Sequence, residues 1–197
     1  MSTKQRPNFT LDVLKWNAWL ETVDDVGPTP EQAELIQKVA PSPDSRTYYA
    51  LLAHDVPALR ERTALFNAIM YGPRGLKRSD RELASVAASL VNGCRYCTSV
   101  HARRYAELTK DMDGIHGLLD AGVDAEVGER ERAIVDFAVR LTKDPEGTTT
   151  ADLEPLRKVG LSDMEILDVA NATAMFAWAN RLMQTLGEGV LPGNTPA

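Results

Sequence analysis

The fold is decided by residues 79–101, SDRELASVAASLVNGCRYCTSVH. An apolar run over residues 83–91 follows a Ser-x-x-Glu segment, which is typical of a helix start because the two side chains cap each other's backbone N–H groups. An Asn-Gly pair at 92–93 then interrupts the run. We therefore predict one buried helix up to this break and a second helix directly after it, which carries Cys97 and His101.

Helical patterns fill most of the remaining chain. Thr29 and Ser162 begin two further capping boxes, and Gly or Pro residues mark most helix ends. No segment shows the alternating β-branched pattern that is typical of a strand. We therefore predict an all-α fold, a compact helical bundle, with helical segments over about 9–26, 29–40, 45–53, 59–71, 79–91, 97–105, 129–143, 150–159 and 162–186.

The length of 197 residues suits one domain. We predict a single all-helical domain over 1–197, in which residues 1–44 form an N-terminal extension with short helices. Residues 45–187 form the core, and residues 188–197 form a loose tail.

An internal similarity suggests two pseudo-repeated helical halves. Residues 79–88 and 162–171 are identical at five of ten positions, with a constant offset of 83. In that register Cys94 corresponds to Ala177 and Cys97 to Asn180. The hypothesis requires the two segments to be equivalent helices, and it would bring the last helix beside the cysteines.

Composition excludes several classes of protein. The 28 acidic and 22 basic side chains give a formal net charge of −6, which argues against a broad nucleic-acid-binding surface. No uncharged stretch approaches the ~20 residues that cross a bilayer, and the first residues do not resemble a signal peptide. We expect a cytoplasmic protein that binds neither nucleic acid nor membrane.

The two cysteines form one motif, Cys94-Arg-Tyr-Cys97. In a reducing compartment such a pair is more often catalytic or metal-binding than structural. His101 lies one helical turn after Cys97, and Glu82 on the preceding helix could hold or relay its proton. A helix N-terminus and an adjacent histidine both favour a thiolate over the free thiol, whose pKa is about 8.5.

Other interpretations of these residues stay open at this point. Glu82 could simply close a capping box onto Ser79, and Tyr96 could pack or donate its hydroxyl into the site. Zinc could bind Cys94, Cys97, His101 and Glu82, which are ligands of suitable type.

The pattern Glu82-x11-Cys94-x2-Cys97-x3-His101 resembles the core motif of the alkylhydroperoxidase D-like, carboxymuconolactone decarboxylase superfamily. Segments over 129–141, 160–163, 180–181 and 186–187 are similar to its branch of peroxidase-related proteins. The resemblance spans about residues 48–187. It implies an all-helical fold and homo-oligomers that assemble through helical faces.

The resemblance also implies a peroxidase cycle with two cysteines. Cys97 resembles the thiolate that attacks hydrogen peroxide or a small organic hydroperoxide, and Cys94 resembles the resolving thiol. His101 and Glu82 resemble the proton relay. Such an enzyme needs no cofactor, metal or flavin, but it needs an external dithiol reductant, which in the family can be a lipoyl-type carrier. The chain departs from the best-known members at Tyr96, where they carry histidine.

Two alternatives belong to other functional classes. The pair could be a non-catalytic redox switch, or the staple of a zinc-containing helical interaction module. The decarboxylase side of the superfamily is a third alternative, but such an enzyme would not need a paired thiol.

Overall fold

The structure, a computed structural model, describes residues 8–192. Over this part of the chain it is all-α apart from two short strands, which confirms the predicted fold class. The helices are α1 (Val23–Val26), α2 (Pro30–Val39), α3 (Arg46–Leu52), α4 (Val56–Tyr71), α5 (Arg78–Asn92), α6 (Arg95–Thr109), α7 (Met112–Ala121), α8 (Glu129–Lys143), α9 (Glu154–Lys158) and α10 (Asp163–Thr185). Three short 3₁₀ helices lie at Pro43–Ser45, Gly122–Asp124 and Thr150–Leu153.

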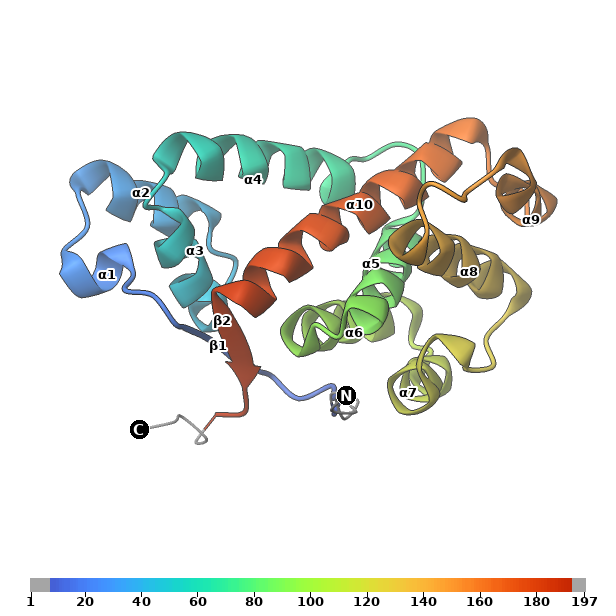
Figure 1. Cartoon of the computed structure of the whole chain (residues 1–197), viewed down its shortest axis with the longest axis horizontal. Helices are drawn as coiled ribbons and strands as arrows, with labels where there is room; N and C mark the ends of the chain where they lie inside the picture. Colours follow the sequence, from blue (N-terminus) through green and yellow to red (C-terminus); the bar gives the residue numbers. More distant parts are fainter. Residues whose placement is uncertain (1–7, 193–197) are drawn as a thin grey trace.

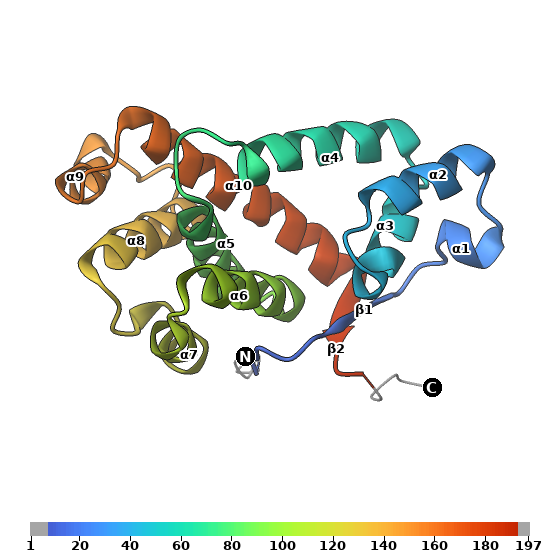
Figure 2. The ribbon, with the colours of Figure 1, turned by 180° about the vertical axis from the view of Figure 1, so that it is seen from behind.

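Helix α5 lies at the centre of the packing. It contacts α6, α8 and α10 along most of its length, and its alanines at 84, 87 and 88 are fully buried. Small side chains let neighbouring helices approach closely, so α5 can be enclosed on several sides. Figures 1 and 2 show α10 running diagonally across the molecule, between α4 on one side and α5 and α6 on the other. The apolar run predicted from the sequence is thus the core helix.

The capping box predicted at Ser79 is wrong. Helix α5 begins two residues earlier than that box requires, with Lys77 as its N-cap, and Ser79 lies inside the helix. The Glu82 side chain is fully buried and bonded elsewhere, so it is not free to close onto a backbone N–H group. The capping boxes at Thr29 and Ser162 are confirmed.

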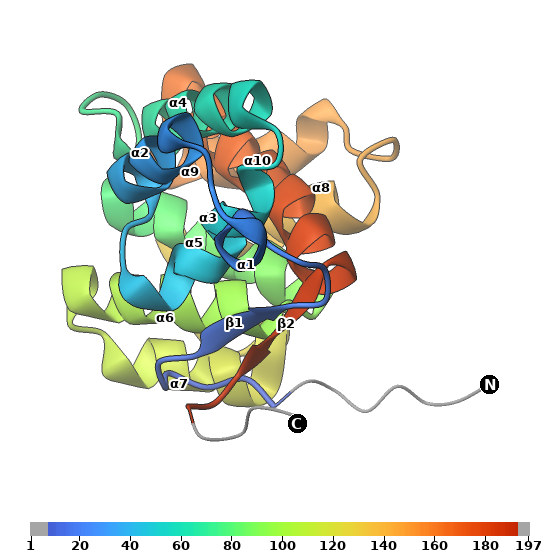
Figure 3. The ribbon, with the colours of Figure 1, turned by 90° about the vertical axis from the view of Figure 1, so that its left-hand side faces the viewer.

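A two-stranded sheet joins the two ends of the described chain. Strand β1 (Lys15–Ala18) pairs antiparallel with β2 (Gly187–Val190), directly after α10 (Figure 3). The Trp16 indole is 1% exposed, and its N–H donates to the Met183 carbonyl at 3.0 Å. The expectations of no strand, of a helical pattern over 9–26 and of a loose segment from residue 188 are therefore corrected. Each strand has only four residues and shows no clear alternation of buried and exposed side chains, so its sequence cannot be distinguished from an incomplete helical pattern.

The predicted repeat is matched only in part. Both segments are helical, and α5 packs against α10. However, α5 begins at residue 78 and ends at residue 92, whereas α10 begins at residue 163 and continues unbroken past Ala177, the counterpart of Cys94. The chain break that creates the cysteine-bearing turn therefore belongs to the first copy alone. The rest of the predicted tail, residues 193–197, lies outside the described residues.

The junction between α5 and α6 fixes the position of the cysteine motif. Gly93 ends α5 in the left-handed region, at φ 75° and ψ 21°. Its N–H donates to the Leu90 carbonyl, and the Cys94 N–H donates to the Ser89 carbonyl at 2.9 Å. This is a Schellman motif, which glycine forms at little steric cost. It reverses the chain and makes Cys94 the N-cap of α6.

The buried apolar side chains between Leu14 and Met183 form one contiguous core. Within the part of the chain that the structure describes, no helix is both long enough and apolar enough to span a bilayer.

Candidate functional site

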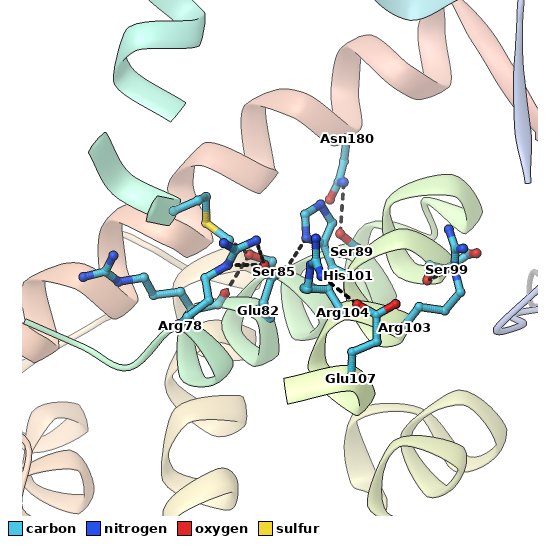
Figure 4. Close-up of polar contacts among 12 residues, drawn as sticks. Arg78, Glu82, Ser85, Ser89, Ser99, His101, Arg103, Arg104, Glu107 and Asn180 are labelled. Atoms are coloured by element: carbon cyan, nitrogen blue, oxygen red, sulfur yellow. Dashed lines mark hydrogen bonds and ion pairs between the residues drawn. The ribbon is translucent and has the colours of Figure 1, made fainter. Parts of the chain in front are cut away.

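A buried carboxylate and an imidazole form the polar centre of the site. Glu82 on α5 is 0% exposed. One of its oxygens is 2.5 Å from the His101 Nδ1 on α6, and the other accepts from the Arg78 Nε at 2.5 Å. Figure 4 shows the two side chains pointing toward each other from neighbouring helices. The structure therefore brings together Glu82 and His101, which are 19 residues apart in the sequence.

The protonation of this pair follows from its surroundings. Burial by itself raises the pKa of Glu82, but the charges and hydrogen bonds of His101 and Arg78 outweigh that effect and hold its pKa below the ordinary value. An ionised carboxylate can only accept hydrogen bonds, so the His101 Nδ1 carries the proton and donates it to Glu82.

The His101 ring lies edge-on to Phe176 of α10, with the ring centroids 4.3 Å apart. The sequence predicts that this ring acts directly on Cys97, one turn before it. Among residues 8–192, however, no hydrogen bond joins the ring to either sulfur, because its Nδ1 is turned toward Glu82. His101 is close to the motif in the chain, but the contact on which the predicted thiol activation depends is not formed.

Both cysteines are free thiols at the N-terminus of α6. Cys94 is the N-cap residue and Cys97 lies one turn further along the helix. The exposed fractions of Cys94 and Cys97 are 2% and 4%, so both residues are buried and their total exposure does not distinguish them. Each thiol has the largest single effect on the acidity of the other, so the two titrate as one coupled pair.

The two thiols have different acidities. The pKa of Cys94 is lowered, first because the Cys97 thiol donates to it, and further by the backbone N–H groups of Tyr96 and Cys97 and by the Asn180 amide. The pKa of Cys97 is raised well above the ordinary value by its bond to Cys94, by burial and by the negative charge of that neighbour. Within the pair, Cys94 is therefore the sulfur that ionises first.

Asn180 was not recognised as a site residue in the sequence. It is fully buried on α10, and its amide donates to the Ser89 hydroxyl at 3.1 Å (Figure 4). Its oxygen accepts from the Asn92 amide at 3.0 Å. The same amide also lowers the pKa of both thiols. The one signal in the sequence was the repeat register, which aligns Asn180 with Cys97.

Two tyrosines flank the thiols. Tyr48 on α3 is 3% exposed, and its hydroxyl has no hydrogen-bond partner among the described residues. Burial raises its pKa, the Arg62 charge opposes this, and Cys97 and Cys94 add to the rise, so the phenol lies within electrostatic reach of both sulfurs. Tyr96 is also buried, which raises its pKa, and Gly189 of β2 passes close to its backbone. Tyr48 follows no recognisable motif and is placed beside the thiols by packing alone.

A cleft of about 1040 Å³ opens beside the motif. It runs between the start of α6, the end of α7 and strand β2, and we call it the Cys94 cleft because Cys94 lines it. Cys97 is not among the described residues of its wall. Part of the wall is apolar, at Phe9, Trp19, Leu90, Leu119 and Met183. The wall also carries charged residues of both signs, Arg95, Asp120, Asp124, Lys143 and Glu188.

The four candidate zinc ligands do not form a metal centre in residues 8–192. No group of three or more Cys, His, Asp or Glu side chains is placed to hold an ion there. Both Glu82 oxygens already bind protein groups, and the Nδ1 of His101 is turned to one of them.

The fold and the site together define a class of protein: an all-helical protein with a Cys-x-x-Cys pair at a helix N-terminus and a buried Glu–His pair beside it. The model of the carboxymuconolactone decarboxylase family matches residues 57–140, which include all four of these residues. A comparison with curated proteins gives no match.

Solved structures agree with this family. A peroxidase-related protein from Ralstonia eutropha JMP134 with an alkylhydroperoxidase AhpD core is 29% identical, with a TM-score of 0.70, over 81% of this chain and 88% of that one. A peroxidase-related protein from Silicibacter sp. TM1040 is 27% identical, with a TM-score of 0.66, over 94% of this chain and 93% of that one. The debrominase Bmp8 is 16% identical, with a TM-score of 0.61 and 86% of each chain covered, and shares the fold.

The family model over residues 57–140 and the two peroxidase-related structures support a likeness to the alkylhydroperoxidase D-like, carboxymuconolactone decarboxylase superfamily and its peroxidase-related branch. This confirms the resemblance found in the sequence.

Proposed function

We propose that the protein is a thiol-dependent peroxidase that reduces hydrogen peroxide or small organic hydroperoxides with the Cys94–Cys97 pair. The observation that carries this proposal is the pair of free thiols at the N-terminus of α6, one helical turn apart, in which the pKa of Cys94 is lowered and that of Cys97 is raised. Such a pair can pass from dithiol to disulfide without a large movement of the chain. Similarity to two peroxidase-related proteins supports the same activity.

The cycle balances without a metal or a flavin. A thiolate attacks the terminal oxygen of the hydroperoxide, the O–O bond breaks, and the leaving alkoxide or hydroxide takes up a proton. The sulfenic acid then condenses with the second thiol to form a disulfide, and water leaves. An external dithiol reduces this disulfide and is itself oxidised to a disulfide, which restores both cysteines.

The Glu82–His101 pair is the proposed source of the proton for the leaving oxygen. Glu82 fixes the tautomer and the orientation of the ring, so that Nε2 is the nitrogen that exchanges protons. The His101 side chain is 13% exposed, which lets it recover a proton from solvent after each turnover. Because its ring makes no hydrogen bond to a sulfur among the described residues, we assign it to proton supply rather than to direct thiol activation.

Assembly into a homo-oligomer is part of the proposal. Leu65 on α4 is 56% exposed, and Trp178 on α10 is 42% exposed. Both line an apolar hollow of about 370 Å³ between these two helices. We propose a second copy of the chain as the partner of this face and the cytoplasm as the compartment, since dithiol reductants are maintained there.

The test is steady peroxide consumption by the reduced protein with dithiothreitol as the dithiol. We expect many turnovers per protein molecule, formation of a Cys94–Cys97 disulfide in the absence of reductant, and no consumption by the Cys94→Ser, Cys97→Ser double variant. The matched control is Ser99→Ala, which leaves both thiols in place. A disulfide that forms once, with no further consumption when dithiothreitol is present, would support a redox switch instead and would overturn the proposal.

A further inference from the structure

We infer that Cys94, rather than Cys97, is the sulfur that meets the peroxide, and that the Cys94 cleft is the route by which the peroxide arrives. This inference rests on the proposed function and reverses the order of attack that the family resemblance implies. Its first support is geometric, since Cys94 lines the cleft and Cys97 is not among the described residues of the cleft wall.

The position of Cys94 in the helix is the second support. As the N-cap residue of α6 it stands in front of the backbone N–H groups of the first turn, which have no partner within the helix. The neutral thiol makes no capping hydrogen bond, but a thiolate there would accept from the Tyr96 and Cys97 N–H groups. Cys97 lies inside the helix, where such groups do not converge on its sulfur.

The position of Cys97 suits a resolving thiol. It lies one helical turn from Cys94, which has the largest effect on its acidity, so it adjoins the place where the sulfenic acid would form. Its other electrostatic neighbours are Asn180 and Arg62, which come from α10 and α4 and not from the cleft. Tyr48, with its unpartnered hydroxyl, responds more to the charge of Cys97 than to that of Cys94.

Each step then has a place in the structure. The Cys94 thiolate attacks the terminal oxygen of a hydroperoxide in the cleft, and the O–O bond breaks. The leaving oxygen takes up a proton that passes from the Glu82–His101 pair through water, since His101 is not among the described residues of the cleft wall. The alcohol or water that forms leaves through the cleft. Cys97 attacks the Cys94 sulfenic acid from the protein side, which forms the disulfide and releases water. One thiol of the external dithiol attacks the Cys94 sulfur, again from the cleft, and Cys97 leaves as the thiol. The second thiol of the reductant then attacks the reductant sulfur of this mixed disulfide, which releases Cys94 and leaves the reductant as a disulfide.

The cleft is larger than hydrogen peroxide requires. Its volume of about 1040 Å³ and its apolar wall at Phe9, Leu119 and Met183 can receive the organic part of a hydroperoxide or of the dithiol reductant. The inference therefore assigns substrate and reductant to the same opening, one after the other.

The experiment compares two single variants, Cys97→Ser and Cys94→Ser, each exposed to hydrogen peroxide at pH 7 with dimedone to trap sulfenic acid. Serine keeps a hydrogen-bond donor at either position and is a favourable N-cap residue, so both variants should retain the helix. We expect Cys94 in the first variant to be trapped at least about tenfold faster than Cys97 in the second, since one pKa unit changes the thiolate fraction about tenfold.

Equal rates, or faster trapping of Cys97, would overturn the inference and leave the proposed function standing. Absence of sulfenic acid in both variants, together with no turnover by the unmodified protein, would overturn the proposed function itself. A second measurement needs no substitution: iodoacetamide at pH 7 should modify Cys94 before Cys97 in the reduced protein, as read by peptide mass spectrometry. Earlier modification of Cys97 would count against the inference even if a variant failed to fold.

Discussion

Glu82 shows how one buried charge organises the site. It lies on the core helix, where a carboxylate without partners would be strongly disfavoured. Arg78, four residues earlier on the same helix, and His101 of α6 bind one oxygen each. The carboxylate thereby fixes the ring and joins α5 to α6. The Ser79-x-x-Glu82 segment is typical of a capping box, but here Glu82 binds Arg78 and His101 instead of the helix N-terminus.

We predict that Glu82→Gln lowers the free energy of unfolding by about 3 kcal/mol at pH 7, because it removes the buried charge that pairs with Arg78 and accepts from His101. The matched control is Glu107→Gln, which removes an exposed pair with Arg104 and should cost less than about 1 kcal/mol. Urea denaturation of both variants measures the difference. A cost for Glu82→Gln no larger than that of the control would contradict the role of the buried pair.

The same carboxylate predicts a pH dependence of stability. The folded-state pKa of Glu82 is below its unfolded value, so its contribution is complete above the unfolded pKa of about 4.3 and is lost as the pH falls through the folded pKa. The difference in stability between the unmodified protein and Glu82→Gln should therefore be constant from pH 7 to about 5 and shrink below about 4. A difference that persisted undiminished at pH 2 would contradict this assignment.

At the scale of elements, the turn between α5 and α6 determines the reactivity of the thiols. Gly93 adopts a left-handed backbone conformation that is unfavourable for residues with a Cβ atom. The resulting turn places Cys94 at the N-cap of α6. Without that turn α5 would continue, as α10 does past Ala177, and Cys94 would lie inside a helix. The two similar segments therefore differ in whether the chain reverses: the first ends in a turn that places Cys94 at a helix N-terminus, and the second continues as a helix.

We predict that Gly93→Ala lowers stability by about 1 kcal/mol and also raises the pKa of the Cys94 thiol, because a strained turn shifts the sulfur away from the first N–H groups of α6. Gly160→Ala is the matched control. Gly160 also has a positive φ, of 84°, with open space around it, and it should show a similar loss of stability with no change at the thiol. The pH dependence of Cys94 alkylation, read by mass spectrometry, separates the two effects.

At the scale of the whole molecule, α10 connects the features of the site. It contributes Asn180 beside the thiols and Phe176 against the His101 ring, and it ends in the strand that pairs with β1. Its outer face, together with α4, exposes Leu65 and Trp178. One helix thus contacts the proposed catalytic residues on its inner face and carries the proposed assembly surface on its outer face.

We predict that Leu65→Glu and Trp178→Glu each shift the protein from an oligomer to a smaller species, because a charge in an apolar contact is disfavoured. Met112→Glu is the control, since Met112 is 45% exposed on α7, away from α4 and α10 (Figure 1). Light scattering coupled to size-exclusion chromatography gives the mass. An unmodified protein that is already monomeric, or a control that dissociates equally, would contradict the choice of this face.

The sequence by itself determined the helical architecture, the core helix, the cysteine pair and the pairing of Glu82 with His101. These follow from local rules, because helical periodicity, turn residues and the i, i+3 and i+4 spacings are all encoded within about one or two turns of chain. The short sheet could not be predicted, because its two strands are more than 160 residues apart and four residues carry little periodicity.

Only the tertiary structure decided how the thiols differ. Asn180 of α10 and Tyr48 of α3 lie near the motif in space but far from it in the chain. The cleft is formed where the start of α6, the end of α7 and β2 meet. A thiol's acidity and access depend on the groups that surround it in space. The sequence therefore identifies the two cysteines as the candidate site. The packing of distant elements around them decides which cysteine lines the cleft and which thiol ionises first.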